Sequence, residues 1–276
     1  MTDLLSQLIQ AVEEADSSKL LLEAVQDLAD AQLEGAIPIL IEALSYNNPG
    51  AAVASVDGLI KLGDPAVPAL LELLDMHNYT ARSWAIRALA GIGDPRGLVT
   101  LLGVATADFA MSVRRAAVKG LGMMKWAWFP DEVCEMAQEE ALDALLFVAQ
   151  QDEEWVVRYA AVVGLESLAI TIANQHPTWR SEIQVQFNLM GCNDEVLAIR
   201  ARAWLAQQKL QESLNQIHTN NLDLVPEAES PLTSDDWQNI LNHLYEIKRE
   251  ERLSSVGEGD PRRFQGLASA IAKPNN

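Results

Sequence analysis

The sequence predicts an all-α solenoid, a stack of about six helix pairs followed by a helical C-terminal tail. Three observations support this prediction. Apolar residues recur with helical spacing, helix-length segments repeat with a period of 30 residues, and no segment alternates polar and apolar residues over the length of a strand. A pair of short helices cannot bury its own apolar stripes, so neighbouring pairs must stack on one another.

The period is clearest in the first third of the chain. Three pairs of segments match at a shift of 30 residues: 36–44 with 66–74, 48–63 with 78–93, and 63–65 with 93–95. The last of these matches is the sequence Gly-Asp-Pro. Three separate matches at one shift indicate a structural repeat rather than chance similarity.

Each repeat has the pattern of two helices. In the first helix of one unit, apolar residues follow i, i+3, i+4, i+7 spacing at Val67, Leu70, Leu71 and Leu74. Pro65 suits the first turn of this helix, and Asp64 is a plausible N-cap. In the second helix an apolar stripe runs through Trp84, Ala85, Ala88, Leu89 and Ile92. Gly93 then suits a left-handed C-cap.

Later units keep this pattern with two interruptions. The segment 113–121 resembles 157–165 and, more weakly, 199–205. The arginines at one repeat position are Arg82, Arg114, Arg158 and Arg200, and their spacings of 32, 44 and 42 residues reveal two inserts. The inserts lie at 126–140 and around 176–179. Inserts in a solenoid map to one face, which is often the binding face.

The chain divides into three parts by composition. We expect the repeats to occupy residues 1–218. Residues 219–234 contain two prolines and no basic residue, which is typical of a linker. Residues 235–276 contain a helical pattern at Trp237, Ile240, Leu241 and Leu244, and they form the predicted helical C-terminal tail.

Charge and cysteine content exclude several classes of function. The net charge of −19 repels phosphate backbones, so nucleic acid is not an expected partner. Two cysteines, Cys134 and Cys192, are too few for a disulfide framework or a structural zinc site, and we expect no metal. The uncharged stretch 97–107 is too short to span a membrane, and the N-terminus lacks a secretory signal. A cytoplasmic protein without membrane insertion is expected.

The repeat itself resembles the short HEAT-like repeat of the bilin lyases of cyanobacterial light-harvesting antennae. Four stretches resemble the F-type (beta) subunit of the heterodimeric E/F-type phycocyanobilin lyases: 46–53, 85–95, 108–117 and 154–161. The resemblance covers residues 5 to 212, so the tail lies outside it. The Tyr-Tyr-Ala-Ala-Trp-Trp stretch of E-type subunits and the adjacent His-Cys pair of the isomerising relatives are both missing.

The resemblance implies a lyase that attaches phycocyanobilin through a thioether to a cysteine of the phycocyanin alpha chain. It also implies an E-type partner subunit, with phycocyanobilin as substrate and no permanently bound cofactor. The expected location is the cytoplasm, either free or associated with phycobilisomes at the thylakoid surface. Because the reacting thiol belongs to the acceptor, no catalytic residue is assigned. The alternative is a non-catalytic HEAT-repeat scaffold or chaperone that binds phycobiliproteins during their assembly or degradation.

Such a ligand requires cations for its two propionates, a carboxylate near its pyrrole nitrogens and flat apolar walls. A positioned Asp could act as an acid, because a proton on the bilin makes it more electrophilic. Arginines and aromatic residues of the second helices and of the first insert supply the other features. The candidate bilin- or partner-binding residues are Arg82, Trp84, Arg87, Arg114, Arg115, Trp126, Trp128, Trp155, Arg158 and Tyr159.

A structural role is open for many of these residues. In stacked helical repeats an arginine at a fixed position commonly bridges to an Asp in the next unit. Trp84 suits the core between helices. Trp126 and Trp128 either contact a bilin or partner, in which case the insert is not needed for stacking, or they fold back over the apolar core. Asp64 and Asp94 suit helix caps better than acids.

Overall fold

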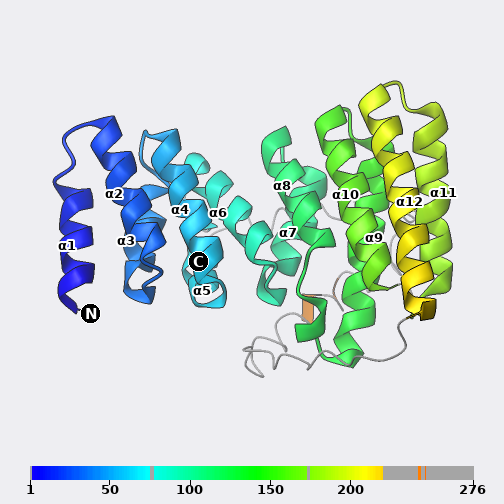
Figure 1. The fold of residues 1–276 in the computed structure, drawn as a ribbon, viewed down its shortest axis with the longest axis horizontal. Helices are drawn as coiled ribbons and strands as arrows, with labels where there is room; N and C mark the ends of the chain where they lie inside the picture. The colour runs from blue at the N-terminus through cyan, green and yellow to red at the C-terminus, as the bar shows by residue number, and fades with distance from the viewer. Residues whose placement is uncertain (1, 75–77, 173–174, 220–241, 244–245, 247–276) are drawn as a thin grey trace.

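The computed structural model describes residues 2–74, 78–172, 175–219, 242–243 and 246. Within this part the chain is helical and contains no strand. Twelve α-helices follow one another as six consecutive pairs, which stack side by side into an elongated array from α1 at one end to α11 and α12 at the other (Figure 1). The predicted all-α solenoid with six helix pairs is confirmed.

The first three pairs are regular and short. Their helices are α1 (Thr2–Glu13), α2 (Ser18–Asp30), α3 (Ile37–Ala43), α4 (Pro49–Leu62), α5 (Val67–Leu74) and α6 (Tyr79–Ile92). Short 3-10 turns precede the first helices of later pairs: η1 (Glu34–Ala36), η2 (Asp64–Ala66) and η3 (Pro95–Gly97). The two repeated Gly-Asp-Pro sequences lie at η2 and η3, so they mark the passage from one pair to the next.

The last three pairs contain the longer helices. They are α7 (Leu98–Ala107), α8 (Met111–Gly122), α9 (Asp131–Gln151), α10 (Trp155–Thr171), α11 (Pro177–Asn193) and α12 (Leu197–Thr219), with η4 (Trp126–Trp128) before α9. The first predicted insert forms η4 and lengthens α9 to 21 residues, against 10 in α7. At the second insert α11 begins with Pro177, and the ring of His176 stacks on that of Trp179 with centroids 4.0 Å apart.

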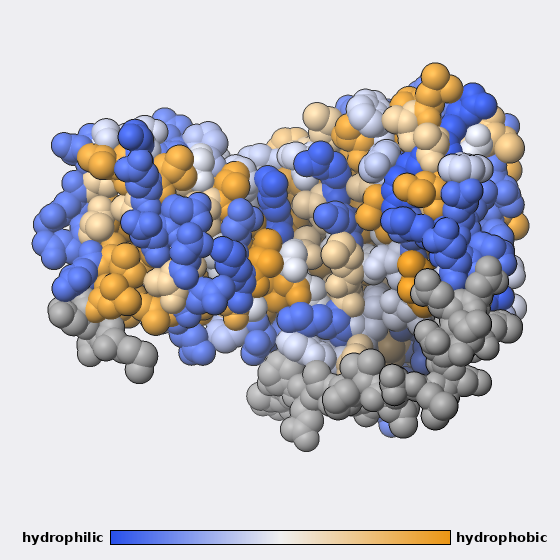
Figure 2. Space-filling view, viewed as in Figure 1, coloured by the Kyte–Doolittle hydropathy of each residue, from blue (hydrophilic) through white to orange (hydrophobic). Residues whose placement is uncertain are grey.

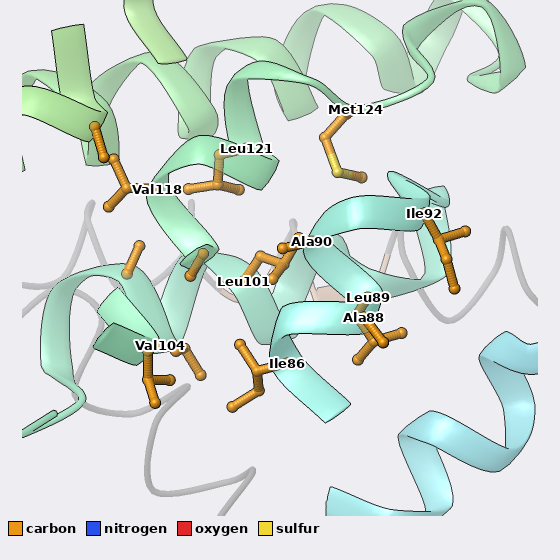
Figure 3. Close-up of a cluster of buried hydrophobic side chains, with 14 of the residues drawn as sticks. Ile86, Ala88, Leu89, Ala90, Ile92, Leu101, Val104, Val118, Leu121 and Met124 are labelled. Atoms are coloured by element: carbon orange, nitrogen blue, oxygen red, sulfur yellow. The ribbon is translucent and has the colours of Figure 1, made fainter. Parts of the chain in front are cut away.

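The helices form two layers with the core between them. The second helices of all pairs contact one another in sequence, from α2 through α4, α6, α8 and α10 to α12, and each also packs on the first helix of its own pair. The apolar stripes predicted from the sequence point into this space. In the close-up of Figure 3, Ile86 and Leu89 of α6 lie with Leu101 of α7 and Leu121 of α8, and all four are buried.

At the boundaries between pairs, Gly93 and Asp94 cap the helix ends as expected, whereas Asp64 does not. Gly93 ends α6 in the left-handed conformation, with φ 69°, as predicted. Asp94 caps the following turn by accepting from the backbone N–H of Arg96 at 2.9 Å. Asp64 makes no such bond, because Gly63 takes the N-cap position of its turn and Asp64 becomes the first residue inside it.

The predicted boundary between the repeats and the linker lies close to the end of the last described helix of the stack. That helix, α12, ends at Thr219. The predicted linker beyond Thr219 lies outside the described residues. So does most of the predicted tail, 235–276, of which only residues 242, 243 and 246 are described, all three as helical.

Candidate functional site: a cationic groove on the second helices

A groove of about 890 Å³ lies on the second helices, across α4, α6, α8 and α10 and up to the start of α12. Its volume falls within the range of pockets that take small organic ligands. Figure 2 shows hydrophilic and hydrophobic surface side by side over these middle helices. The groove therefore offers both polar and apolar contacts to one ligand.

Three cations and one carboxylate line the groove. Asp57, Arg87 and Lys119 occupy the same repeat position on α4, α6 and α8, and Arg115 lies one turn before Lys119. Side chains at one repeat position face the same way, because consecutive second helices are stacked in parallel. Within the described part of the chain, no ion pair or hydrogen bond engages the side chains of the three cations. Their positive charge is thus available to an anionic ligand.

Aromatic side chains form much of the apolar wall. Trp84 of α6 lies next to Arg87, whose guanidinium carbon is 5.3 Å from the indole ring centroid. On α10, Trp155 and Tyr159 stand one turn apart and are 46% and 37% exposed. Large aromatic faces left accessible beside free cations suit a flat, conjugated, anionic molecule.

Five of the ten candidate residues meet in this groove: Trp84, Arg87, Arg115, Trp155 and Tyr159. Four polar residues of the groove are not among the candidates predicted from the sequence: Asp57, Ser83, Ser112 and Lys119. Two of them could have been found from the repeat register, because Asp57 precedes Arg87 by one period and Lys119 follows it by the next. The pattern is inconspicuous in the sequence because the charge at this position changes from one repeat to the next.

Three of the remaining candidates form a ladder of ion pairs between successive helix pairs. Arg82 contacts Asp108 at 2.9 Å, Arg114 contacts Asp152 at 2.7 Å, and Arg158 contacts Asp194 at 3.0 Å. In each pair the aspartate belongs to the next helix pair and is at most 8% exposed. In the structure these three arginines bridge successive helix pairs, which is the structural role that the sequence left open.

The ladder is extended by backbone hydrogen bonds. Arg114 donates through Nε and Nη2 to both carboxylate oxygens of Asp152, and its Nη1 donates to the backbone carbonyls of Asp108 and Phe109. Arg158 repeats this arrangement with Asp194 and the carbonyls of residues 152 and 153. The hydrogen bonds to Asp152 and Asp194 are the main cause that raises the pKa of the two guanidinium groups. Both arginines are therefore held in place and turned away from ligand binding.

The two insert tryptophans lie outside the groove. Trp126 is 6% exposed and packs against Phe129, with ring centroids 5.2 Å apart. The expectation that the insert is not needed for stacking is wrong for Trp126, because the insert folds back and Lys125 N–H donates to the carbonyl of Gly93 at 2.8 Å. Trp128 is only half-buried, and Lys125 Nζ lies 3.9 Å from its ring centroid.

The described residues offer neither a metal site nor a reactive thiol beside the groove. No group of three or more His, Cys, Asp and Glu side chains in this part of the chain is placed to hold a metal ion. Burial raises the pKa of the Cys134 thiol to about 11, so the thiol, not the nucleophilic thiolate, is the form present at neutral pH. Among the described helices, none has the length and apolarity to cross a membrane.

Comparison with known proteins identifies the family. A model for HEAT repeats matches residues 5–90 and 67–166. The phycocyanobilin lyase subunit beta of Pseudanabaena tenuis is 78% identical over 282 residues, which cover the whole of both chains. The phycocyanin alpha phycocyanobilin lyase CpcF of a Synechocystis species is 54% identical over 169 residues, covering 61% of this chain and 78% of the relative.

A solved structure of a phycocyanin lyase complex is also similar to this chain. In the complex of CpcE and CpcF of the phycocyanin lyase from a Nostoc species, the matching chain has 46% sequence identity and a TM-score of 0.56. The match covers 63% of this chain and 98% of that chain. These findings confirm the resemblance seen in the sequence. The chain belongs to the HEAT-repeat family of phycocyanobilin lyase beta subunits.

Proposed function

We propose that this chain is one subunit of a heterodimeric lyase that attaches phycocyanobilin through a thioether to a cysteine of the phycocyanin alpha chain. The relative from Synechocystis is named for phycocyanobilin lyase activity on phycocyanin alpha, and the similar solved chain is part of a complex of two different subunits. The observation in this molecule that supports the proposal is the groove, in which unpaired cations adjoin exposed aromatic faces.

The groove residues match the chemistry of a linear tetrapyrrole. Arg87, Arg115 and Lys119 bind the two propionate groups, because carboxylates form strong charge-assisted hydrogen bonds with such donors. Trp155 and Tyr159 pack against the conjugated ring system. In this arrangement the subunit binds, orients and shields the bilin. The acceptor thiol then adds across a C=C bond of the bilin: a C–S bond forms, the S–H bond and the C=C π bond are lost, the proton ends on the bilin, and no group leaves.

Asp57 is the carboxylate of the groove, and we assign it to the bilin's pyrrole nitrogens. It lies at the repeat position of Arg87 and Lys119, on the neighbouring helix α4. A carboxylate at this place accepts hydrogen bonds from pyrrole N–H groups and favours their protonated form. A protonated bilin is more electrophilic, so this residue assists the addition of the thiol.

The proposed function also specifies a partner subunit, a substrate in place of a bound cofactor, and a cellular location. The chain acts with an E-type subunit, takes phycocyanobilin as a substrate that leaves with the acceptor, and has no permanently bound cofactor. It works in the cytoplasm, where the phycobilisomes at the thylakoid surface are assembled. The organisms of the relatives and the absence of a membrane-spanning helix among the described residues are consistent with this location.

Removing the groove cations tests the proposal. We expect Arg87→Gln and Arg115→Gln each to raise the KM for phycocyanobilin about tenfold, because each removes a charge-assisted hydrogen bond worth about 1.5–3 kcal/mol. The measurement is covalent adduct formation on the phycocyanin alpha chain, with the E-type subunit present. The matched control is Lys19→Gln on α2, a helix that contributes no residue to the groove; the Lys19 side chain is 82% exposed.

The same assay distinguishes the lyase from a scaffold. A scaffold or chaperone would bind the phycocyanin alpha chain and yield no covalent adduct with the unaltered protein. Adduct formation that is equally fast in the Arg87, Arg115 and Lys19 variants would remove the groove from the proposal while leaving the lyase activity in place.

A further inference from the structure

The lining of the groove changes along the stack, from charged on α6 and α8 to apolar on α10. The ladder arginines of these three helices make equivalent ion pairs, so residues at the same distance from them correspond. Five residues after each ladder arginine stand Arg87, Lys119 and Val163, and all three line the groove. The position that carries a cation on α6 and α8 thus carries an uncharged side chain on α10.

A second lining position changes at the same step. One residue after each ladder arginine stand Ser83, Arg115 and Tyr159, which also line the groove. The hydroxyl of α6 and the cation of α8 are followed on α10 by an aromatic ring that is 37% exposed. Two independent repeat positions therefore lose their charge between α8 and α10.

The other groove residues at this end of the groove are uncharged as well. They are Trp155, Val156 and Ala160 of α10 and Ala198 at the start of α12. Together with Tyr159 and Val163 they are called the α10 subsite below. Because none of these six residues carries a charge, the subsite offers walls to an uncharged group and no cation to a carboxylate.

The α10 subsite lies directly beside the cations of α8, because α8 and α10 are in close contact. A Cβ atom added to Gly122 of α8 would lie 2.3 Å from the Cα of Gly164 of α10, so the two backbones meet without a side chain between them. A ligand whose carboxylates are bound by Arg115 and Lys119 therefore reaches the subsite with the part next to those carboxylates.

In a linear tetrapyrrole the two middle rings carry the propionates, and the two outer rings carry none. We propose that the α10 subsite binds one outer ring of the bilin, so that the tetrapyrrole lies across the second helices with its propionates over α6 and α8. The inference rests on the proposed function and specifies the orientation of the ligand in the groove. Trp155 and Tyr159 pack against the outer ring, and Asp57 of α4 lies on the opposite side of the cations.

A neutral polar group in the subsite tests the orientation, because an outer ring and a propionate predict changes of opposite sign. We expect Val163→Asn to raise the Kd for phycocyanobilin about tenfold, because the amide loses its hydration against an uncharged ring. A propionate at this place would instead accept a hydrogen bond from the amide, and the Kd would fall. The measurement is quenching of tryptophan fluorescence by phycocyanobilin in the complex of the full-length chain with the E-type subunit.

The matched control is Val185→Asn on α11, whose side chain is 57% exposed and does not line the groove. It should leave the Kd unchanged. Melting followed by circular dichroism shows whether both variants fold, since Val163 is half-buried.

A truncation at an exposed side chain makes the test independent of the folding of the Val163 variant. We expect Tyr159→Ala to raise the same Kd about tenfold, because the outer ring loses an aromatic wall. Tyr79→Ala is its control, since Tyr79 is 39% exposed, against 37% for Tyr159, and lies outside the groove.

The outcomes separate the orientation from the function. An unchanged or lower Kd in the Val163 variant, or an unchanged Kd in the Tyr159 variant, would overturn the orientation while the lyase activity stands. Normal phycocyanobilin binding with slower adduct formation would also overturn it, because the subsite would then contact the acceptor chain. Failure of the unaltered complex to bind phycocyanobilin would overturn the proposed function as well.

Discussion

At the scale of single residues, the ladder aspartates have two roles each. Asp152 binds Arg114 of the preceding pair and also accepts from the backbone N–H of Glu154 at 2.9 Å, which turns the chain into α10. Asp108 and Asp194 do the same in their turns. One side chain thus joins two helix pairs and initiates a helix, so its removal affects both functions.

We expect Asp152→Asn to destabilise the protein by about 3 kcal/mol, because Arg114 would keep its charge in a place that is mostly closed to water. The measurement is chemical denaturation followed by circular dichroism. Glu72→Gln, the same change at an exposed site on α5, is the control and should shift the unfolding free energy by less than about 0.5 kcal/mol. Equal stability of the two variants would mean that the ladder does not hold the pairs together.

At the scale of helices, the contact between α8 and α10 depends on glycine. A Cβ atom added to Gly122 would lie 2.3 Å from the Cα of Gly164, a backbone atom that cannot rotate away. The two helices approach this closely only because neither has a side chain there. Since both helices line the groove, their separation also determines its width.

Gly122→Ala should therefore push α8 and α10 apart and destabilise the protein by about 2–3 kcal/mol. Gly191→Ala in α11 is a matched control, because its Cβ would meet nothing within 4 Å and should leave stability unchanged or raise it slightly. Thermal melting of the two variants provides the comparison. A melting temperature for Gly122→Ala as high as that of Gly191→Ala would contradict the close helix contact.

The first insert provides a second test at this scale. We expect Trp126→Ala to lower the unfolding free energy by about 3–5 kcal/mol, because the ring is buried with Phe129 in the core, and Trp128→Ala by less than about 1 kcal/mol. Each variant is compared with the unaltered protein by denaturant unfolding. If both changes are equally mild, the insert is a surface appendage, as one of the two sequence interpretations held.

At the scale of the whole molecule, an acidic protein presents a cationic groove. The net charge is −19, yet Arg87, Arg115 and Lys119 line one surface with Asp57 as the acidic residue among them. The stacking of the repeats brings these charges together, because successive second helices add side chains to the same face. The groove therefore attracts an anionic ligand even though the net charge of the protein is negative.

The same stacking accounts for the difference between the two ends of the array. An internal helix pair is covered on both sides, so Val118 and Val162 are buried. Trp204 occupies the equivalent position in the last pair and is exposed, because nothing in the described chain stacks on it. The exposure of Trp204 follows from the repeat being continued in register to α12.

The sequence by itself determined the helices, the repeat and the family. Helical periodicity and the 30-residue shift were sufficient, because the helix stripes and the Gly-Asp-Pro turns are local features. It also identified the ladder arginines as a set, although their partners lie 26 to 38 residues away and were not assigned.

The tertiary structure decided which candidates share a site. Arg114 and Arg115 are neighbours in the sequence, yet one is bound to Asp152 and the other faces the groove, because successive residues of a helix point about 100° apart. Trp126 is in the core because the insert folds back, and a hydrogen bond from the backbone N–H of Lys125 to the carbonyl of Gly93 joins the insert to the end of α6. The direction of a side chain in a stack depends on packing between pairs, and no local pattern contains that information.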